Sequence, residues 1–437
     1  MEKFIITPPE KLEGEITVPG DKSISHRAVM IGSIAKGDTI IENFLRSDDC
    51  YHTIDCFKKM GIEIEEGEQI KVKGKGLNGL REPHDVLDVG NSGTTMRLLM
   101  GILAGQKFHA TVTGDQSIRR RPMGRVVDPL KRMGAKIHGR QKDTLAPLTI
   151  FGGKLNPINY ELPVASAQVK SAILFAGLYA SGPTTVIEKK ISRDHTERML
   201  EHFGAKIERE DGKITVKERS DLAAQTISVP GDISSAAFLI VAACITPNSK
   251  ILIRNVGVNP GRIGIIEILH RMDANIEVIN ERMISNEPVA DISVRSSELR
   301  PITIDGDIVP KIIDEIPIIA LAASQAKGET TIRGAEELRF KESDRIKTMV
   351  KELKRLGVDV DELRDGMKIR GKAKLKSCIC QSYGDHRIAM VGAVAGLIAS
   401  GGTTVEKTEC IETSFPEFPS FINKLAKKEC IEVLPLN

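Results

Sequence analysis

Residues 19–27 read Pro-Gly-Asp-Lys-Ser-Ile-Ser-His-Arg. The Pro-Gly pair interrupts regular backbone, so we expect a helix to open around Ser23. Apolar residues recur at positions 24, 28, 31 and 35, which is the spacing of one buried helix face. Ser23 and Arg27 are one turn apart, and together with Lys22 and the first-turn amides they form a potential anion site. A capped helix with solvated charges explains this stretch equally well, so the decision rests on the remaining chain.

The opening of this stretch is repeated, because Val-Pro-Gly-Asp stands at 18–21 and again at 229–232. A small-residue helix is expected after each copy. Four more segments have a polar cap, a run of Ala, Gly, Leu and Ile, and a Gly or Ser-Gly stop; they are residues 90–105, 164–181, 313–328 and 383–401. The six copies lie about 70 residues apart, which exceeds solenoid periods and makes each a whole βαβα-type subdomain.

A second helix with its own signature is expected in each unit. Leu-Lys-Arg-Met-Gly-Ala at 130–135 resembles Leu-Lys-Arg-Leu-Gly-Val at 353–358. Related hexapeptides occur at 57–62, 200–205 and 269–274, the last with Asp in place of Gly. The Gly is predicted to end the helix, and the β-branched residues after it to begin a strand.

The duplicated Val-Pro-Gly-Asp predicts how the chain divides. Three units fall in a first domain, residues 20–229, and three in a second domain, residues 231–437 together with 1–18. The chain then crosses between domains at 19–20 and 230–231. Two such Pro-Gly crossings predict a hinge that lets the domains close over a ligand.

Composition excludes several classes of protein. The chain has 437 residues, a net charge of +3, no Trp and 4% aromatic residues, so we expect no nucleic-acid partner. The longest apolar runs, 236–245 and 388–399, are shorter than the roughly 20 residues of a membrane span, and we expect them to be core helices. Seven scattered cysteines and the lack of a signal peptide predict a cytoplasmic protein without a membrane partner.

Charged residues gather at the expected helix starts. Residues 90–97 open with two glycines and several hydroxyls, as an anion nest does, while residues 114–125 hold four arginines without aromatic residues between them. Further charges head the helices near 166–170, 192–195, 313–317, 339–345 and 384–387. Capping alone would account for several of these. If the domains close with these ends facing, the cleft would hold two small anions and two carboxylates for proton transfer.

Other chemistries find less support. The sequence has no metal-ligand spacing, no Ser-His-Asp order and no Cys in the arginine-rich loop, so we predict neither a metal, a cofactor nor a covalent mechanism.

Six motifs, in this order, resemble those of the 5-enolpyruvylshikimate-3-phosphate (EPSP) synthase family over essentially the whole chain. They are Pro-Gly-Asp-Lys-Ser-Ile-Ser-His-Arg (19–27), Gly-Asn-Ser-Gly-Thr-Thr-Met-Arg (90–97), Arg-Pro-Met-Gly (121–124), Ser-Ala-Gln-Val-Lys-Ser-Ala (166–172), Lys-Glu-Ser-Asp-Arg (341–345) and Gly-Asp-His-Arg (384–387). The resemblance implies an α/β fold of the inside-out barrel type, with six βαβαββ units, three in each of two domains. It also implies transfer of the carboxyvinyl group of phosphoenolpyruvate to the 5-hydroxyl of shikimate 3-phosphate by a monomer, with the active site in the interdomain cleft.

The resemblance also implies roles for individual residues. Shikimate 3-phosphate would be bound by Lys22, Ser23, Arg27, Ser166, Ala167, Gln168, Arg193, Asp314 and Lys341. Phosphoenolpyruvate would be bound by Lys22, Asn91, Gly93, Thr94, Arg121, Gln168, Arg345 and Arg387. The catalytic residues would be Lys22, with Asp314 as base for the hydroxyl and Glu342 as proton donor to the methylene carbon.

This chain departs from the family's best-known branch at several positions. Thr413 stands where that branch has a lysine, Ala167 where it has a second serine, Glu337 where it has an asparagine, and Leu98 where it has a proline. The motifs Ser-Ala-Gln-Val-Lys (166–170), Arg-Asp-His-Thr (193–196) and Arg-Pro-Met-Gly (121–124) are more similar to the second class of the family. Some glyphosate-tolerant members of that class carry Ala in place of Gly93. Because Gly93 is kept here, inhibition by glyphosate is expected.

Three other classes of protein agree less well with the sequence. A UDP-N-acetylglucosamine enolpyruvyl transferase would have a Cys in its mobile loop, and residues 110–125 contain none. An RNA cyclase-like protein would require nucleotide or metal features that the sequence lacks. A catalytically inactive anion-binding scaffold would be expected to lose Asp314 or Glu342, and both are present.

Overall fold

The computed structural model describes residues 1–217 and 221–436, which form two compact units. The N-terminal unit consists of Gly20–Pro230 and Met283–Glu287. The C-terminal unit consists of Met1–Pro19, Gly231–Arg282 and Pro288–Asn437. Met283–Glu287 is the tip of a hairpin whose strands belong to a sheet of the C-terminal unit. The tip is held in the N-terminal unit by hydrogen bonds such as Ser228 N to Ser285 Oγ, 3.0 Å.

Six four-stranded sheets are formed by the described residues, three in each unit. The strands of the N-terminal unit are β3 (Lys36–Glu42), β4 (Glu63–Glu66), β5 (Ile70–Lys75), β6 (Leu87–Asp88), β7 (His109–Thr113), β8 (Lys136–Gly139), β9 (Leu145–Phe151), β10 (Asn159–Glu161), β11 (Thr184–Ile187), β12 (Ile207–Glu210), β13 (Lys213–Val216) and β14 (Thr226–Ser228). Those of the C-terminal unit are β1 (Glu2–Ile6), β2 (Glu13–Thr17), β15 (Lys250–Gly257), β16 (Asn275–Ile284), β17 (Glu287–Arg295), β18 (Thr303–Ile304), β19 (Gly328–Ile332), β20 (Asp359–Leu363), β21 (Gly366–Gly371), β22 (Ile379–Gln381), β23 (Thr403–Glu406) and β24 (Ile431–Pro435).

All six sheets share one plan, in which a parallel edge strand is followed by antiparallel neighbours. In the sheet β18-β19-β21-β20, for example, Thr303 pairs with Thr331 in parallel, and Thr330 pairs with Ile369 antiparallel. Three sheets are completed by a strand from a distant part of the chain: β14 joins β3, β2 joins β15, and β1 lies between β23 and β24. The repeated plan is what the sixfold sequence repeat requires.

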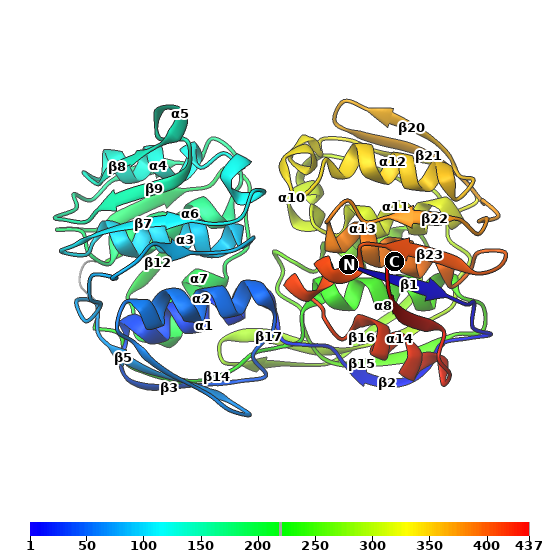
Figure 1. Cartoon of the computed structure of the whole chain (residues 1–437), viewed down its shortest axis with the longest axis horizontal. Helices are drawn as coiled ribbons and strands as arrows, with labels where there is room; N and C mark the ends of the chain where they lie inside the picture. The colour runs from blue at the N-terminus through cyan, green and yellow to red at the C-terminus, as the bar shows by residue number, and fades with distance from the viewer. Residues whose placement is uncertain (218–220, 437) are drawn as a thin grey trace. The chain divides into compact units, whose positions relative to one another are not determined.

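Helices alternate with these strands. The N-terminal unit has α1 (Lys22–Ile34), α2 (Asp48–Lys59), α3 (Gly93–Ala104), α4 (Gly124–Arg132), α5 (Arg140–Asp143), α6 (Ala167–Gly177), α7 (His195–His202) and the 3₁₀ turn η1 (Ile118–Arg120). The C-terminal unit has α8 (Ile233–Ile245), α9 (Gly264–Arg271), α10 (Val309–Ile312), α11 (Ile316–Gln325), α12 (Arg345–Arg355), α13 (His386–Gly396), α14 (Phe418–Ala426), η2 (Gly306–Ile308), η3 (Glu336–Phe340) and η4 (Thr408–Thr413). Figure 1 shows their order along the chain within each unit.

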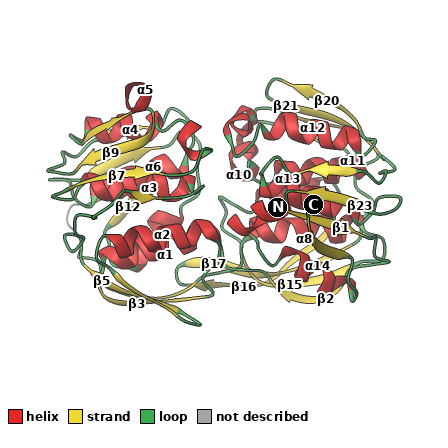
Figure 2. Ribbon diagram, viewed as in Figure 1, coloured by secondary structure: helices red, strands yellow, loops and turns green. Residues whose placement is uncertain are grey.

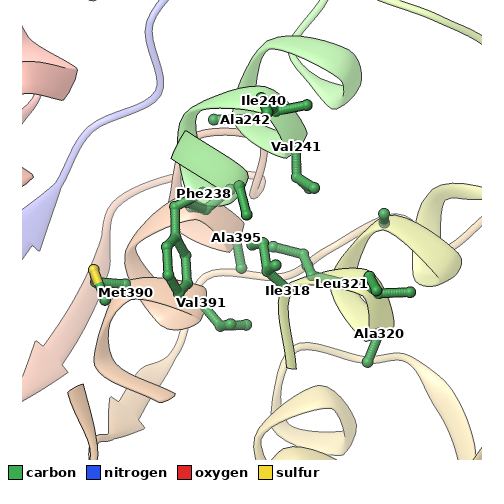
Figure 3. Packing of buried hydrophobic residues seen from close by; sticks show 14 of the residues in the cluster. Phe238, Ile240, Val241, Ala242, Ile318, Ala320, Leu321, Met390, Val391 and Ala395 are labelled. Atoms are coloured by element: carbon green, nitrogen blue, oxygen red, sulfur yellow. The ribbon is translucent and has the colours of Figure 1, made fainter. Parts of the chain in front are cut away.

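The small-residue helices form the centre of each unit. In the C-terminal unit, α8 is apolar on all sides and buried from Ile233 to Cys244, and it packs against α11 and α13. Figure 3 shows Phe238 and Val241 of α8 near Ile318 of α11 and Val391 of α13. The strands instead alternate buried and more exposed residues, as in β9, so each sheet covers the helices with one face (Figure 2). This is the helices-inside arrangement expected of the fold.

The second helices end where the hexapeptide signature predicts. The glycine after each helix adopts a left-handed conformation that a side chain disfavours. Its φ is 84° at Gly61, 101° at Gly134, 95° at Gly204 and 86° at Gly357. The equivalent Asp273 has φ 62°. In the sixth unit Lys427, with φ 55°, takes this place after α14. This helix end contains no glycine, so the hexapeptide signature did not predict it.

Within residues 1–217 and 221–436, no helix is long and apolar enough to cross a membrane. All seven cysteines are free thiols, most of them buried. The same described residues contain no group of three or more His, Cys, Asp or Glu side chains that could hold a metal ion.

Candidate active site

The site residues predicted from sequence fall into two sets, one in each unit. The N-terminal unit contains Lys22, Ser23, Arg27, Asn91, Gly93, Thr94, Arg121, Ser166, Ala167, Gln168 and Arg193. The C-terminal unit contains Asp314, Lys341, Glu342, Arg345 and Arg387. Nearly all stand at or just before the first turn of a helix, where unpaired amides and the helix dipole favour anions.

The first turn of α1 is fixed from two sides. Asp21 caps the helix by accepting a hydrogen bond from Ile24 N at 2.9 Å. Lys22 Nζ lies 2.5 Å from Oδ2 of Asp49, a largely buried acid in the first turn of α2. Asp49 was not predicted as a site residue, because the signature hexapeptide of α2 lies at the end of the helix (57–62) and none of the six motifs covers its start. The ammonium of Lys22 is therefore held by a counter-ion of the same unit.

Arg27 is buried, with 3% of its surface exposed. Its guanidinium donates to Thr196 Oγ1 at 2.6 Å, to Ser23 O at 2.9 Å and to Ser171 Oγ at 3.0 Å. Among the described residues, no carboxylate lies within 4 Å of it. Burial lowers the pKa of Arg27 to about 10, which still leaves the group protonated near neutral pH. The arrangement is thus a buried cation whose charge is not neutralised by an ion pair.

The start of α3 brings two arginines toward one glycine. Ser92 caps the helix by accepting from Thr95 N at 3.1 Å. A Cβ added at Gly93 would lie 2.7 Å from an Nη1 atom of Arg97 and 3.3 Å from that of Arg121. Arg97 was not singled out by sequence reasoning, which read it only as part of the motif 90–97. The glycine therefore leaves room for the Arg97 guanidinium, and a methyl group added there would also come close to that of Arg121.

Arg121 and Gln168 are each held by residues of the predicted site. Arg121 donates to Asn91 Oδ1 at 2.7 Å and to Ser117 Oγ at 3.0 Å. Gln168 accepts from Arg97 at 2.8 Å and donates to Thr94 Oγ1 at 3.1 Å. These bonds connect α3, α6 and the arginine-rich loop into one polar surface.

Ser166 caps α6 by accepting from Val169 N at 3.4 Å, and Ala167 is the first residue of that helix. Arg193 is half-buried just before α7. The serine and the arginine therefore both stand at helix starts of this unit.

Lys170 has a structural place that the charge pattern did not indicate. It is 1% exposed, and its Nζ lies 2.8 Å from Glu188 and 2.7 Å from Glu197. Burial raises the pKa of Glu197. Burial alone would lower the pKa of Lys170, but the two carboxylates outweigh it and raise that pKa. This buried triad ties α6 to α7 and to the loop that leads to Arg193.

Arg345 is the centre of the site residues in the C-terminal unit. Its guanidinium lies 2.8 Å from Asp385 Oδ2, 2.6 Å from Glu342 Oε2 and 3.5 Å from Asp314 Oδ1. Lys341 Nζ lies 3.2 Å from the same oxygen of Asp314. Burial alone would lower the pKa of Arg345, but the charges of Asp385 and Glu342 raise it. One arginine thus contacts both predicted proton-transfer groups.

Asp385 joins Arg345 to Arg387. It is fully buried, and it caps α13 by accepting from Arg387 N at 3.0 Å. Burial alone would raise the pKa of Asp385, but Arg345 holds it below its usual value. The Gly-Asp-His-Arg motif at 384–387 predicts a charged helix start but no role for Asp385. Asp385 therefore pairs with the guanidinium of Arg345 and fixes the backbone of Arg387.

A duplicated α/β fold whose helix starts carry arginines, hydroxyls and paired carboxylates defines an enzyme that acts on small anions. The family model described as EPSP synthase (3-phosphoshikimate 1-carboxyvinyltransferase) matches residues 6–422. The 3-phosphoshikimate 1-carboxyvinyltransferase of Pelotomaculum thermopropionicum is 56% identical over 95% of this chain and 96% of that protein. The protein of the same name from Desulforamulus reducens is 53% identical over 97% of this chain and 99% of that protein.

A solved structure gives the same result. The EPSP synthase of Acinetobacter baumannii is 45% identical, covers 100% of both chains and superposes with a TM-score of 0.89. The chain therefore belongs to the EPSP synthase family, as its six motifs predict. It is a transferase of aromatic biosynthesis that moves an enolpyruvyl group from phosphoenolpyruvate to shikimate 3-phosphate. The two-domain inside-out α/β fold expected from the sequence is confirmed.

Proposed function

We propose that the site residues of both units act on the same pair of substrates and transfer the carboxyvinyl group to the 5-hydroxyl of shikimate 3-phosphate, with release of phosphate. The observation that carries this proposal is the cluster around Arg345, where a buried arginine contacts both Asp314 and Glu342. Addition followed by elimination requires one group that accepts a proton from the hydroxyl and one that protonates the methylene carbon.

Asp314 is the proposed base. Lys341 Nζ lies 3.2 Å and Arg345 Nη1 lies 3.5 Å from its Oδ1, so two cations stand beside the carboxylate that would accept the proton. As the 5-hydroxyl oxygen attacks C2 of phosphoenolpyruvate, its proton passes to Asp314, while Glu342 gives a proton to C3. The tetrahedral ketal then loses phosphate, which takes up the proton held by Asp314. A methyl proton returns to the Glu342 carboxylate, so the double bond is restored and both acids regain their starting state.

The arginines bind charge that is present in both substrates and in the intermediate. Arg27, a buried cation whose hydrogen-bond partners are hydroxyl and carbonyl oxygens, is suited to shikimate 3-phosphate, which would also contact Lys22, Ser23, Ser166, Ala167, Gln168, Arg193, Asp314 and Lys341. Phosphoenolpyruvate would contact Lys22, Asn91, Gly93, Thr94, Arg121, Gln168, Arg345 and Arg387. Fixed cations of this kind stabilise a developing anion without reorganisation, and loss of one costs about 3 kcal/mol or more.

The test is phosphate release from phosphoenolpyruvate, measured with shikimate 3-phosphate in one reaction and UDP-N-acetylglucosamine in a parallel one. Release with the shikimate ester alone supports the proposal. Phosphate release with the nucleotide sugar alone would show that shikimate 3-phosphate is not the acceptor. Phosphate release with neither compound would favour a catalytically inactive anion-binding scaffold.

Glyphosate is the proposed inhibitor, because Gly93 leaves open the space beside Arg97 and Arg121 that an added methyl group would enter. Inhibition should be competitive with phosphoenolpyruvate. Turnover that is unchanged by saturating glyphosate at low phosphoenolpyruvate contradicts this part. We further propose that the protein is a cytoplasmic monomer. Sedimentation of the purified chain would test its oligomeric state.

A further inference from the structure

Two consecutive acids just before α11 face different arginines. Asp314 contacts Lys341 and Arg345, as described above. Glu315, the next residue, is fully buried, and its Oε1 lies 3.9 Å from Nη1 of Arg387. Within the part of the chain that the structure describes, Glu315 is the one carboxylate within 4 Å of that guanidinium. Each of the two acids therefore faces a different arginine of the proposed phosphoenolpyruvate site.

Glu315 is itself fixed from behind by the start of α8. Ser234 donates its hydroxyl proton to Glu315 Oε1. Arg262, which is 3% exposed, donates to Ser234 Oγ at 2.8 Å and to Asp232 Oδ1 at 2.9 Å. Because an arginine can only donate, the single proton of Ser234 is available to Glu315 and the direction of the chain is set. The carboxylate thus has a defined position and an accepting role.

The position of Glu315 orients the Arg387 guanidinium and leaves its N–H groups able to bind a ligand anion. A separation of 3.9 Å exceeds hydrogen-bonding distance, so the carboxylate attracts the guanidinium without using its N–H donors. The Arg387 side chain is 12% exposed, and its backbone N–H is held by Asp385. A ligand anion can therefore still use the donors of this arginine.

The two Val-Pro-Gly-Asp copies differ in a way that matches this arrangement. In the first, Lys22 and Ser23 follow the capping Asp21 and belong to the proposed site. In the second, Ile233 replaces the lysine, and Ser234 bonds internally to Glu315. The cation beside Ser234 is instead Arg262 from the loop before α9.

We propose that Glu315 is a positioning residue for the reaction, which sets the guanidinium of Arg387 for phosphoenolpyruvate through the chain Arg262–Ser234–Glu315. This inference rests on the proposed role of Arg387. It assigns the two acids before α11 different tasks, proton transfer for Asp314 and orientation of an arginine for Glu315.

The test compares Glu315→Gln with the wild-type enzyme by steady-state phosphate release. The variant should raise KM for phosphoenolpyruvate at least tenfold and change KM for shikimate 3-phosphate less than twofold. Asp291→Asn is the matched control, since Asp291 is another buried, ion-paired carboxylate of the same unit. It is bonded to Arg254, Asn255 and Asn280, none of which belongs to the proposed site. The control variant should lower the urea midpoint and leave both KM values unchanged.

Ser234→Ala keeps the carboxylate but removes its donor, so it should raise KM for phosphoenolpyruvate by a smaller factor and serves if Glu315→Gln does not fold. Arg387→Lys is measured in parallel. The double variant Glu315→Gln/Arg387→Lys completes the comparison. If Glu315→Gln and Arg387→Lys each raise KM for phosphoenolpyruvate, and the double variant raises it no more than Arg387→Lys alone, then Glu315 and Arg387 act as one unit.

Several results overturn the proposal. An unchanged KM for phosphoenolpyruvate in Glu315→Gln would mean that the carboxylate does not position Arg387. A lowered KM would mean that the carboxylate only opposes anion binding. An equal rise of both KM values with a loss of stability would mean a merely structural role. If Arg387→Lys leaves KM for phosphoenolpyruvate unchanged, the proposed role of Arg387 itself is refuted. If Arg387→Lys raises this KM strongly but Glu315→Gln leaves it unchanged, only the role of Glu315 is refuted.

Discussion

Replacement of Gly93 by Ala should separate binding of phosphoenolpyruvate from the stability of the fold. The new methyl group would lie 2.7 Å from Arg97 Nη1 and 3.3 Å from Arg121 Nη1. Ordinary contact begins at 3.4 Å, so the Arg97 guanidinium must move by about 0.7 Å and that of Arg121 by about 0.1 Å. Both are ends of flexible side chains, and the backbone can remain in place.

Displacement of the Arg97 guanidinium should weaken the hydrogen bonds that connect it to the proposed phosphoenolpyruvate site. Arg97 donates to Gln168 at 2.8 Å, and Gln168 in turn donates to Thr94. A hydrogen bond to a charged group contributes about 1.5–3 kcal/mol, which corresponds to a rise in KM for phosphoenolpyruvate of roughly 10- to 150-fold. The fold itself should lose nothing, because Ala is a better helix former than Gly by up to about 1 kcal/mol.

The assay is phosphate release at saturating shikimate 3-phosphate and varied phosphoenolpyruvate, beside urea unfolding of the same preparations. Gly124→Ala is the matched control. Gly124 is the first residue of α4 as Gly93 is of α3, and its added methyl group would approach only Thr144, at 3.3 Å. It should change KM less than twofold.

A KM for phosphoenolpyruvate that stays within twofold of wild type in Gly93→Ala would refute the reasoning, because the arginines would then have adjusted without cost. A fall in the free energy of unfolding of more than about 1 kcal/mol would also refute it, since the effect on binding could then follow from damage to α3.

Three further predictions concern other groups. Lys170→Met leaves Glu188 and Glu197 buried without their cation and should lower the free energy of unfolding by about 3–5 kcal/mol in urea titrations; a loss below about 1 kcal/mol would speak against a buried ion-pair triad. Burial alone would raise the pKa of Asp291, but donated hydrogen bonds lower it to about 2, below its value of 3.8 in the unfolded chain. Asp291 therefore stabilises the fold above about pH 4, by about 2 kcal/mol relative to Asp291→Asn, and this advantage should disappear as the pH falls from about 4 to about 2; a difference that is constant over this range is the contrary result. Glu342→Gln should lower kcat by about 10²- to 10⁴-fold with little change in either KM, and a kcat near that of the wild type would remove Glu342 as the proton donor.

Local sequence patterns determined the elements of this protein. Helix spacing, N-caps such as Asp21 and Ser92, and glycines such as Gly61 act within a few residues of the chain, so their effect can be read without a structure. The duplicated Val-Pro-Gly-Asp and the six motifs likewise predicted the repeat and the family. The helix end at Lys427 could not be read, because a left-handed lysine has no distinctive sequence signal.

Only the tertiary structure decided how the charged side chains are paired. Lys22 and Asp49 come from different helices, and Arg345 and Asp385 are separated by forty residues of chain. Lys170 and Glu315 are charged residues at expected helix starts, as the predicted site residues are. Lys170 is nevertheless a buried structural cation, and Glu315 faces Arg387. A charge at a helix start has the same sequence pattern whether it meets a ligand or a buried partner, and that difference depends on which distant helix packs beside it.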